Sequence, residues 1–290
     1  MTTAVAANSG IAQDPGHFAA HDGIRLHYRI HPPLAEARGG VLVMHGFAEH
    51  GGRYAELVDA LTPAGYAIMT FDARGHGKSG GTRVYVESFA EYVHDLRAAI
   101  ELASRLLPQP LYLFGHSQGG LIALRTLIDA PDLVKGLIVS NPALANKVQV
   151  PMWKALLAKG ASRFAPRLTI PSGVPASDIS RDPEAVRAYA SDPLNCKDAT
   201  SRWYTEFLGA QDEVLRRPGD LRGLPTLALI GTGDRIIDAD VSRAYFDRVG
   251  SAAQVILYPG FYHELIHEPE ADRTRVLADI RGWLDARLAS

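Results

Sequence analysis

Six short apolar runs, separated by longer stretches with helical periodicity, constrain the fold of this chain more than any other feature. The runs are VLVMHG (41–46), AIMTFD (67–72), LYLFGH (111–116), GLIVSN (136–141), TLALIG (226–231) and QVILYPG (254–260). Each is too continuously apolar for a half-exposed strand, which is typical of parallel strands buried on both faces. The helical stretches between them, such as 53–64, 88–106, 119–129 and 241–249, predict an α/β sheet covered by helices on both faces.

The remaining segments predict the domain organisation. Residues 1–14 are small and polar and predict a flexible N-terminal tail. The stretch HFAAHDGIRLHYRIH (17–31) predicts a β-hairpin around its Asp-Gly pair. Between Pro142 and about Leu221 the alternation stops, and no clear strand is visible. We therefore expect a core formed by 15–141 and 221–290, with a helical cap inserted at 142–220.

One stretch of the predicted cap, VPMWKALLAKGASRFAP (150–166), has apolar residues near helical spacing. These are Met152, Trp153, Leu156, Leu157, Ala161 and Phe164. Two interpretations remain open. The side chains can be ordinary core, or the helix can lie on a lipid surface through its apolar face. The second interpretation predicts transient contact of the cap with a membrane surface.

Composition narrows the class of protein. Hydrophobic residues make up 47% of the chain and charged residues 21%, which is enough for a sizeable core. A formal net charge of -2 without a basic stripe gives no indication of a nucleic-acid partner. Cys196 is the only cysteine, so no internal disulfide can form. Its side chain is either a free surface thiol or an ordinary packing residue without a chemical role. We see no signal peptide and no run of the ~18 apolar residues that a membrane helix needs, and expect a cytoplasmic protein. Nothing in the sequence indicates an oligomeric state.

The strongest motif is GHSQG, which follows the run at 111–116 and precedes the helical pattern LIALRTLIDA. A Gly-x-Ser-x-Gly motif in this context is typical of a sharp strand-to-helix turn that exposes a serine, with flanking glycines that leave room for the backbone. The helix N-terminus that follows favours developing negative charge. We interpret Ser117 as a nucleophile, and the alternative is a purely structural turn.

A serine nucleophile needs a general base and a carboxylate that orients it. In chain order, TGDRIID follows the run at 226–231 and FYHELIH follows the run at 254–260. The first acid and the first histidine after these strands predict the set Ser117, Asp234 and His263. Asp238 and Asp240 are alternatives for the carboxylate, and His267 is the alternative for the base.

The same C-terminal stretch contains His-Glu-x-x-His, the pattern with which zinc proteases bind metal from one helix face. The downstream EPEADRTR lacks the glycine and histidine of the extended zinc motif, and Pro269 disfavours a long helix beginning at His263. Glu270, Asp272 and Asp279 remain as candidate third ligands. GHGKSG (75–80) matches a dinucleotide-binding pattern, but no helix follows it at once. We therefore expect no metal and no organic cofactor.

Five blocks in the right order carry a resemblance to a known family. They are HGFAEHGGRY (45–54), FDARGHGKSGG (71–81), GHSQGG (115–120), GTGDRIID (231–238) and YHELIHE (262–268). Together they resemble the monoacylglycerol lipase branch of the α/β-hydrolases, also described as lysophospholipase-like, and the first block is the most specific. The resemblance implies a mostly parallel eight-stranded sheet flanked by helices, with a helical cap.

The resemblance also implies roles for further residues. The backbone amides of Phe47 and Gln118 would form the oxyanion hole. Glu49 and Arg53 would organise the loop near the alcohol site, and an equally weighted alternative is a structural ion pair. His267 would contact a polar head group.

The expected function is ester hydrolysis through an acyl-enzyme on Ser117. The resemblance implies monoacylglycerol as the substrate, cleaved to free fatty acid and glycerol. A broad carboxylesterase or a lysophospholipase is the alternative within enzymes. A non-catalytic binding protein with the hydrolase fold is the alternative from another class.

Overall fold

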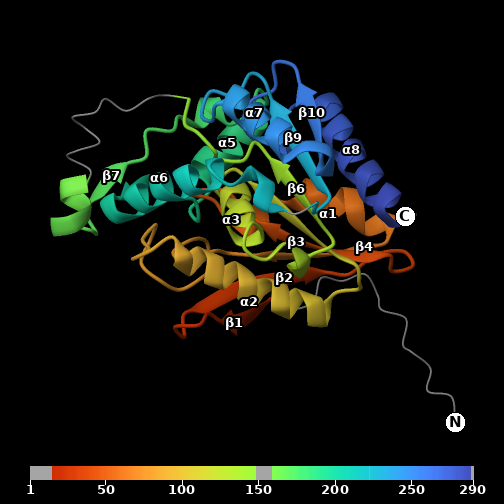
Figure 1. The fold of residues 1–290 in the computed structure, drawn as a ribbon, viewed down its shortest axis with the longest axis horizontal. Coiled ribbons are helices and arrows are strands. Elements are labelled where there is room, and N and C mark those ends of the chain that lie inside the picture. Colours follow the sequence, from red (N-terminus) through yellow and green to blue (C-terminus); the bar gives the residue numbers. More distant parts are fainter. Residues whose placement is uncertain (1–14, 148–158, 222, 289–290) are drawn as a thin grey trace, which may run out of the picture.

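A central eight-stranded sheet with helices on both faces organises the computed structural model, which describes residues 15–147, 159–221 and 223–288 (Figure 1). The strand order is β1-β2-β4-β3-β5-β6-β9-β10. β2 pairs antiparallel with both β1 and β4, and all the other neighbours in this sheet are parallel. The strands are β1 (Gly16–Ala19), β2 (Arg25–His31), β3 (Gly39–Met44), β4 (Tyr66–Phe71), β5 (Leu111–His116), β6 (Gly136–Ser140), β9 (Thr226–Gly231) and β10 (Ala253–Tyr258).

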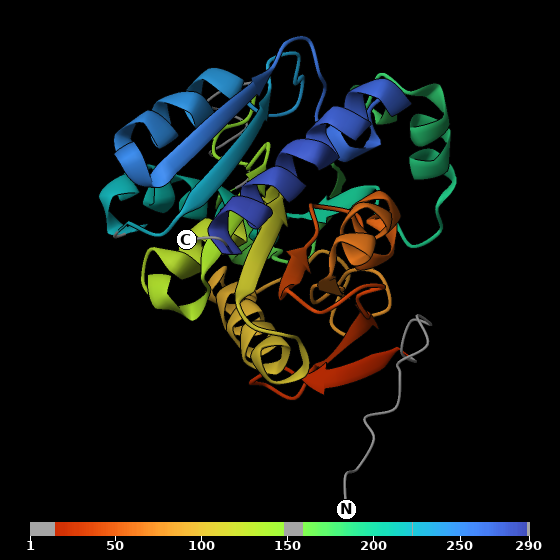
Figure 2. The ribbon, with the colours of Figure 1, turned by 90° about the vertical axis from the view of Figure 1, so that its right-hand side faces the viewer.

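More helices pack on one face of the sheet than on the other. They are α1 (Ala55–Leu61), α2 (Ala90–Leu106), α3 (Gln118–Leu127), α5 (Pro183–Ser191), α6 (Ser201–Leu215), α7 (Ala239–Val249) and α8 (Glu270–Leu288). α1 and α8 bury their apolar side chains against one face, and Figure 2 shows α8 lying across it. α2, α3 and α7 pack on the other face, where α6 joins them through α3. None of the described helices is both long enough and apolar enough to cross a bilayer.

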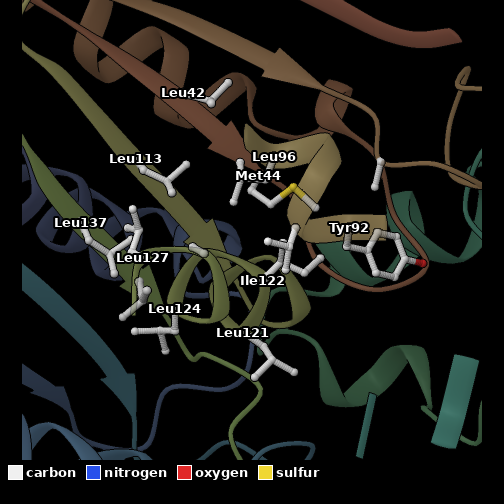
Figure 3. Close-up of a cluster of buried hydrophobic side chains, with 14 of the residues drawn as sticks. Leu42, Met44, Tyr92, Leu96, Leu113, Leu121, Ile122, Leu124, Leu127 and Leu137 are labelled. Carbon is white, nitrogen blue, oxygen red and sulfur yellow. The ribbon is translucent and has the colours of Figure 1, made fainter. Parts of the chain in front are cut away.

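The larger hydrophobic core lies between the sheet and the pair α2 and α3. Figure 3 shows part of it: Leu42, Met44, Tyr92, Leu96, Leu113, Leu121, Ile122, Leu124, Leu127 and Leu137. The expectation that the run at 254–260 is a strand buried on both faces was wrong, because β10 lies at the edge of the sheet and is only partly buried. Every residue of β3, β4, β5, β6 and β9 is buried. Burial on both faces explains why these strands are continuously apolar in the sequence instead of alternating.

The α/β-hydrolase fold that the sequence predicts is confirmed. All six apolar runs are strands of the sheet, and the segment at 17–31 is the antiparallel hairpin of β1 and β2. The expectation of no strand within 142–220 was wrong, because β7 (Thr169–Pro171) and β8 (Asp198–Thr200) pair antiparallel there. Strands of three residues are too short for an alternating pattern to be visible in a sequence.

Some predicted segments lie outside the described residues. These are the N-terminal tail at 1–14 and the part of the cap at 148–158, with Met152, Trp153, Leu156 and Leu157. The described end of the predicted cap helix, 159–164, is helical.

Candidate active site

Ser117 occupies a sharp turn between β5 and α3. Its backbone has φ 50° and ψ -118°, a conformation that costs a non-glycine residue on the order of 1–3 kcal/mol. A side chain at Gly119 would clash with the backbone oxygens of Met44 and His45 at the end of β3. A Cβ at Gly115 would lie 2.7 Å from the Gly119 oxygen. Gly119 is therefore required by the close packing of this turn against the end of β3, and Gly115 by the close packing of β5 against the start of α3.

The structure brings together the three residues predicted as nucleophile, base and carboxylate. His263 Nε2 lies 2.9 Å from Ser117 Oγ, and His263 Nδ1 lies 2.7 Å from Asp234 Oδ2. All three side chains are buried. In the tautomer with the proton on Nδ1, His263 donates to Asp234 and accepts from the Ser117 hydroxyl. This chain of hydrogen bonds can move a proton from Ser117 to His263.

Asp234 is held as an anion by its surroundings. Burial raises the pKa of this carboxyl, but the charge of His263 and hydrogen bonds from His263 and two backbone amides hold the pKa below its usual value. Those amides belong to Ile236 and Ile237, at 2.8 and 2.9 Å from Asp234 Oδ1. A fixed anion at this point keeps the imidazole in one orientation.

The two rival carboxylates have other places in the structure. Asp238 caps α7 by accepting hydrogen bonds from the backbone amides of Asp240 and Val241. Asp240 itself is exposed in the first turn of α7. Neither makes a hydrogen bond to His263 among the described residues.

His263 stands in the loop after β10, before a 3₁₀ turn at Leu265–His267. Burial lowers the pKa of its imidazole, but the charge and hydrogen bond of Asp234 outweigh burial, and Glu264 and Glu49 add to the effect. The net result is a pKa above the usual value for histidine. The imidazole of His263 is therefore more easily protonated than a free imidazole.

Asn141, which the sequence did not single out, fixes the loop that carries His263. Its Nδ2 donates to the backbone oxygens of Tyr262 and His263, at 3.0 and 2.7 Å. Its Oδ1 accepts from Gly231 N–H at 2.8 Å. The backbone of Asn141 has a φ of 40°. In the sequence, the only sign of this role was a polar residue directly after a buried strand.

The His-Glu-x-x-His stretch is not a helix face. α8 begins only at Glu270, and the two imidazoles have separate partners. His267 Nδ1 lies 2.8 Å from Glu264 Oε2, and His267 Nε2 lies 2.8 Å from the Arg53 backbone oxygen. Both ring nitrogens of both histidines are thus engaged by protein groups.

The two residues predicted to supply oxyanion donors flank Ser117. Gln118 is the first residue of α3, so its N–H has no partner within the helix. Phe47 lies in the loop after β3, which passes close to Ser117: a Cβ at Gly46 would be 3.3 Å from Ser117 Cβ. The next residue, Ala48, has φ 63°, a conformation uncommon for a residue with a side chain.

A buried network of charges joins the predicted substrate-binding residues Glu49, Arg53 and His267 to Glu264. Arg53 donates to Glu49 Oε2 at 2.7 Å and to the two oxygens of Glu264 at 2.6 and 2.7 Å. Glu49 Oε1 accepts from Gly46 N–H at 2.6 Å and from Tyr54 Oη at 2.8 Å. The loop between β3 and α1 is thereby tied to the loop of His263.

The charges in this network compensate each other. Burial raises the pKa of Glu264, but Arg53 and His267 hold it well below its usual value. Burial lowers the pKa of His267, but Glu264 and Glu56 raise it to about 10. Three carboxylates, those of Glu49, Glu264 and Glu56, thus face the Arg53 guanidinium and the His267 imidazolium.

The predicted cap contacts the same loop at several points. The ring of Phe47 lies 4.3 Å from the ring of Trp203, and Cys196 N–H donates to the Ala48 oxygen at 2.8 Å. In the same loop, His50 Nε2 lies 3.0 Å from Asp192 Oδ2. The Arg53 guanidinium lies over the ring of Tyr189, 4.8 Å from its centroid. Cys196 is partly buried, and burial raises the pKa of its thiol.

The chain is similar to several known proteins whose names refer to the same activity. A protein named monoacylglycerol lipase from Mycolicibacterium smegmatis is 33% identical over 93% of this chain and 96% of its own length. The human protein named monoglyceride lipase is 31% identical over 96% of this chain and 92% of its own length. The crystal structure of Paleococcus ferrophilus monoacylglycerol lipase superposes with a TM-score of 0.82 at 31% identity, covering 90% of this chain and 99% of the other.

A family model described as serine aminopeptidase, S33, matches residues 35–270. This range contains the turn at Ser117, Asp234, the loop of His263 and the whole predicted cap. The chain belongs to this family of α/β-hydrolases.

Proposed function

We propose that the protein is a carboxylic ester hydrolase that cleaves monoacylglycerol to free fatty acid and glycerol through an acyl-enzyme on Ser117. The hydrogen-bonded set of Ser117, His263 and Asp234 carries the proposal for the chemistry. The relatives that match over most of the chain carry the proposal for the substrate, because they are named for monoacylglycerol or monoglyceride. No metal and no organic cofactor takes part in this mechanism.

The reaction has two halves. Ser117 Oγ attacks the ester carbonyl while His263 Nε2 takes its proton, and Asp234 stabilises the resulting imidazolium. His263 then gives that proton to the leaving alcohol, which frees glycerol and leaves the acyl group on Ser117. A water molecule repeats the sequence: His263 takes its proton, and the carboxylic acid leaves as Ser117 regains its hydrogen.

We assign the developing negative charge on the carbonyl oxygen to the amides of Phe47 and Gln118. Both flank the nucleophile, and Gln118 N–H lies at the N-terminus of α3, where the helix dipole favours an anion. One donor of such a hole is worth roughly 3–4 kcal/mol in the transition state.

The sequence left two interpretations open for Glu49 and Arg53, organisation of the loop near the alcohol site or a structural ion pair, and the resemblance implied that His267 contacts a polar head group. Their polar atoms are already bonded to one another, to Glu264 and to the backbone. This arrangement supports the structural ion pair, and we propose that the alcohol lies beside the network without being bound by it.

Substrate profiling tests the proposed activity. We expect initial rates on 1-monooleoylglycerol to exceed those on dioleoylglycerol, lysophosphatidylcholine and p-nitrophenyl butyrate. Ser117→Ala should reduce all of them by at least about 10³-fold, because the nucleophile is lost. Circular dichroism should show an unchanged fold. Fast p-nitrophenyl butyrate turnover with negligible monooleoylglycerol turnover would keep the chemistry and reject the lipid, and a fully active Ser117→Ala protein would reject both.

The raised pKa of His263 predicts the pH dependence. The base works only when unprotonated, so kcat/KM should fall as pH falls through a pKa above the usual histidine value of 6.5. Asp234→Asn removes the largest cause that raises this pKa, so the acid limb should move to lower pH. The kcat should also fall by about 10⁴-fold. A sensitive fluorogenic ester makes both profiles measurable, and an unmoved acid limb would contradict the assignment of the base.

We also propose that the cap makes peripheral contact with a membrane surface. In its described part, Phe164, Leu168 and Ile170 are exposed, Phe164 by 84%. Three cationic residues, Lys159, Arg163 and Arg167, are exposed in the same segment. Apolar side chains among cations suit a surface with anionic headgroups.

Flotation with vesicles tests this contact. The double change Phe164→Ser and Leu168→Ser should weaken binding to phosphatidylcholine–phosphatidylglycerol vesicles by at least about 10-fold, because two apolar side chains no longer enter the lipid. Leu106→Ser at the end of α2 is the control, since Leu106 is also exposed but lies outside the cap. Equal flotation of all three proteins, or no flotation of the wild type at low salt, would refute the proposal.

A further inference from the structure

Glu264 belongs to the His-Glu-x-x-His stretch, and the proposed reaction leaves it without a role. It follows His263 directly, and its side chain is almost fully buried, with 4% of the residue exposed. Both carboxylate oxygens accept from the Arg53 guanidinium, at 2.6 and 2.7 Å. Such a two-pronged pair fixes the relative orientation of two side chains more strictly than a single hydrogen bond.

The pair connects two loops that the proposed reaction needs. Arg53 also bonds Glu49, and Glu49 accepts from Gly46 N–H at 2.6 Å, one residue before Phe47. An unbroken series of charge-assisted hydrogen bonds therefore runs from the residue after the base to the residue before an oxyanion donor. Each bond in the series is between 2.6 and 2.7 Å long.

The carboxylates have no free oxygen for a substrate. Glu264 Oε1 and Oε2 are taken by Arg53, and Oε2 also accepts from His267 Nδ1 at 2.8 Å. Glu49 is 2% exposed, and its oxygens are taken by Gly46 N–H, the Tyr54 hydroxyl and Arg53. These residues can therefore act on the reaction only through other groups.

We propose that Glu264 is a positioning residue which, through Arg53 and Glu49, holds the loop of the Phe47 amide at a fixed distance from the loop of His263. The inference rests on the proposed function, since it concerns the geometry of that same site. Nucleophile, base and oxyanion donor belong to three different loops, and a shift of about 1 Å between such groups can cost on the order of 100-fold in rate.

The main experiment compares Glu264→Gln with a matched control on two esters. Asp95→Asn is the control, because Asp95 makes the same kind of buried two-pronged pair with Arg74, at 2.6 and 2.7 Å, on α2. The substrates are 1-monooleoylglycerol and p-nitrophenyl butyrate, whose leaving group has no glycerol. Rates are expressed per folded protein, with the folded fraction taken from thermal unfolding.

For Glu264→Gln we expect kcat to fall by about 10- to 100-fold on both esters, with KM changed by less than about 3-fold. The acid limb of kcat/KM should also move to lower pH, because a buried negative charge beside His263 is lost. Asp95→Asn should lower the melting temperature but leave kcat within about 2-fold and the pH profile unmoved, since among the described residues the Arg74 guanidinium bonds only Asp95, Asp22 and Glu91 and makes no hydrogen bond to the loops of Phe47 and His263.

Glu264→Asp keeps the experiment decisive if Glu264→Gln does not fold. It retains the charge but is one methylene too short to meet Arg53 with the same geometry. Positioning predicts a reduced kcat on both esters with the acid limb near its wild-type position. A role in charge balance alone predicts full activity of Glu264→Asp, which would overturn the proposal.

Two other results would overturn it. One is a loss confined to KM on monooleoylglycerol, which would mean contact with glycerol. The other is an equal loss of kcat in Asp95→Asn, which would mean a general effect of breaking a buried ion pair. Activity that survives in Ser117→Ala would refute the proposed function itself, whereas normal rates in Glu264→Gln beside an inactive Ser117→Ala would refute only the positioning role.

Discussion

The close approach of the turn at Ser117 to the end of β3 is the constraint on which the rest of the site depends. It is possible only because Gly119 has no side chain to meet the backbone oxygens of Met44 and His45. The approach brings the serine, the first amide of α3 and the loop after β3 to the same edge of the sheet. In parallel α/β sheets this carboxyl edge is where ligands bind, because loops from several strands converge there.

A second constraint is the burial of charge around that edge. Asp234 and His263 compensate each other beside Ser117, while Glu49, Arg53, Glu264 and His267 do so in the network that begins at the residue after His263. A buried charge without a partner costs several kcal/mol, so each group restricts where the others can stand. The predicted cap adds contacts from Trp203, Cys196, Asp192 and Tyr189 to the loop after β3, which links the position of this segment to the loop of Phe47.

Those parts of the molecule that have a local pattern could be predicted from the sequence. Six strands of the sheet are continuously apolar runs, and Ser117, Asp234 and His263 each follow such a run in an order that the fold imposes. Glu264 and Asn141 could not be predicted in the same way. Their partners lie 211 and 122 residues away in the chain, and no period or spacing connects them. The strands β7 and β8 were not predicted, because a strand of three residues is too short to show an alternation of apolar and polar residues.

The most direct test of the account is to locate the nucleophile with an alkyl fluorophosphonate, which phosphonylates an activated serine and stays attached. Peptide mass spectrometry should find one phosphonyl group per chain, on Ser117, with hydrolysis of monooleoylglycerol lost in proportion to labelling. His263→Ala should label far more slowly. A protein that is labelled on another residue while its activity disappears, or that stays unlabelled while it hydrolyses the ester, would contradict the account.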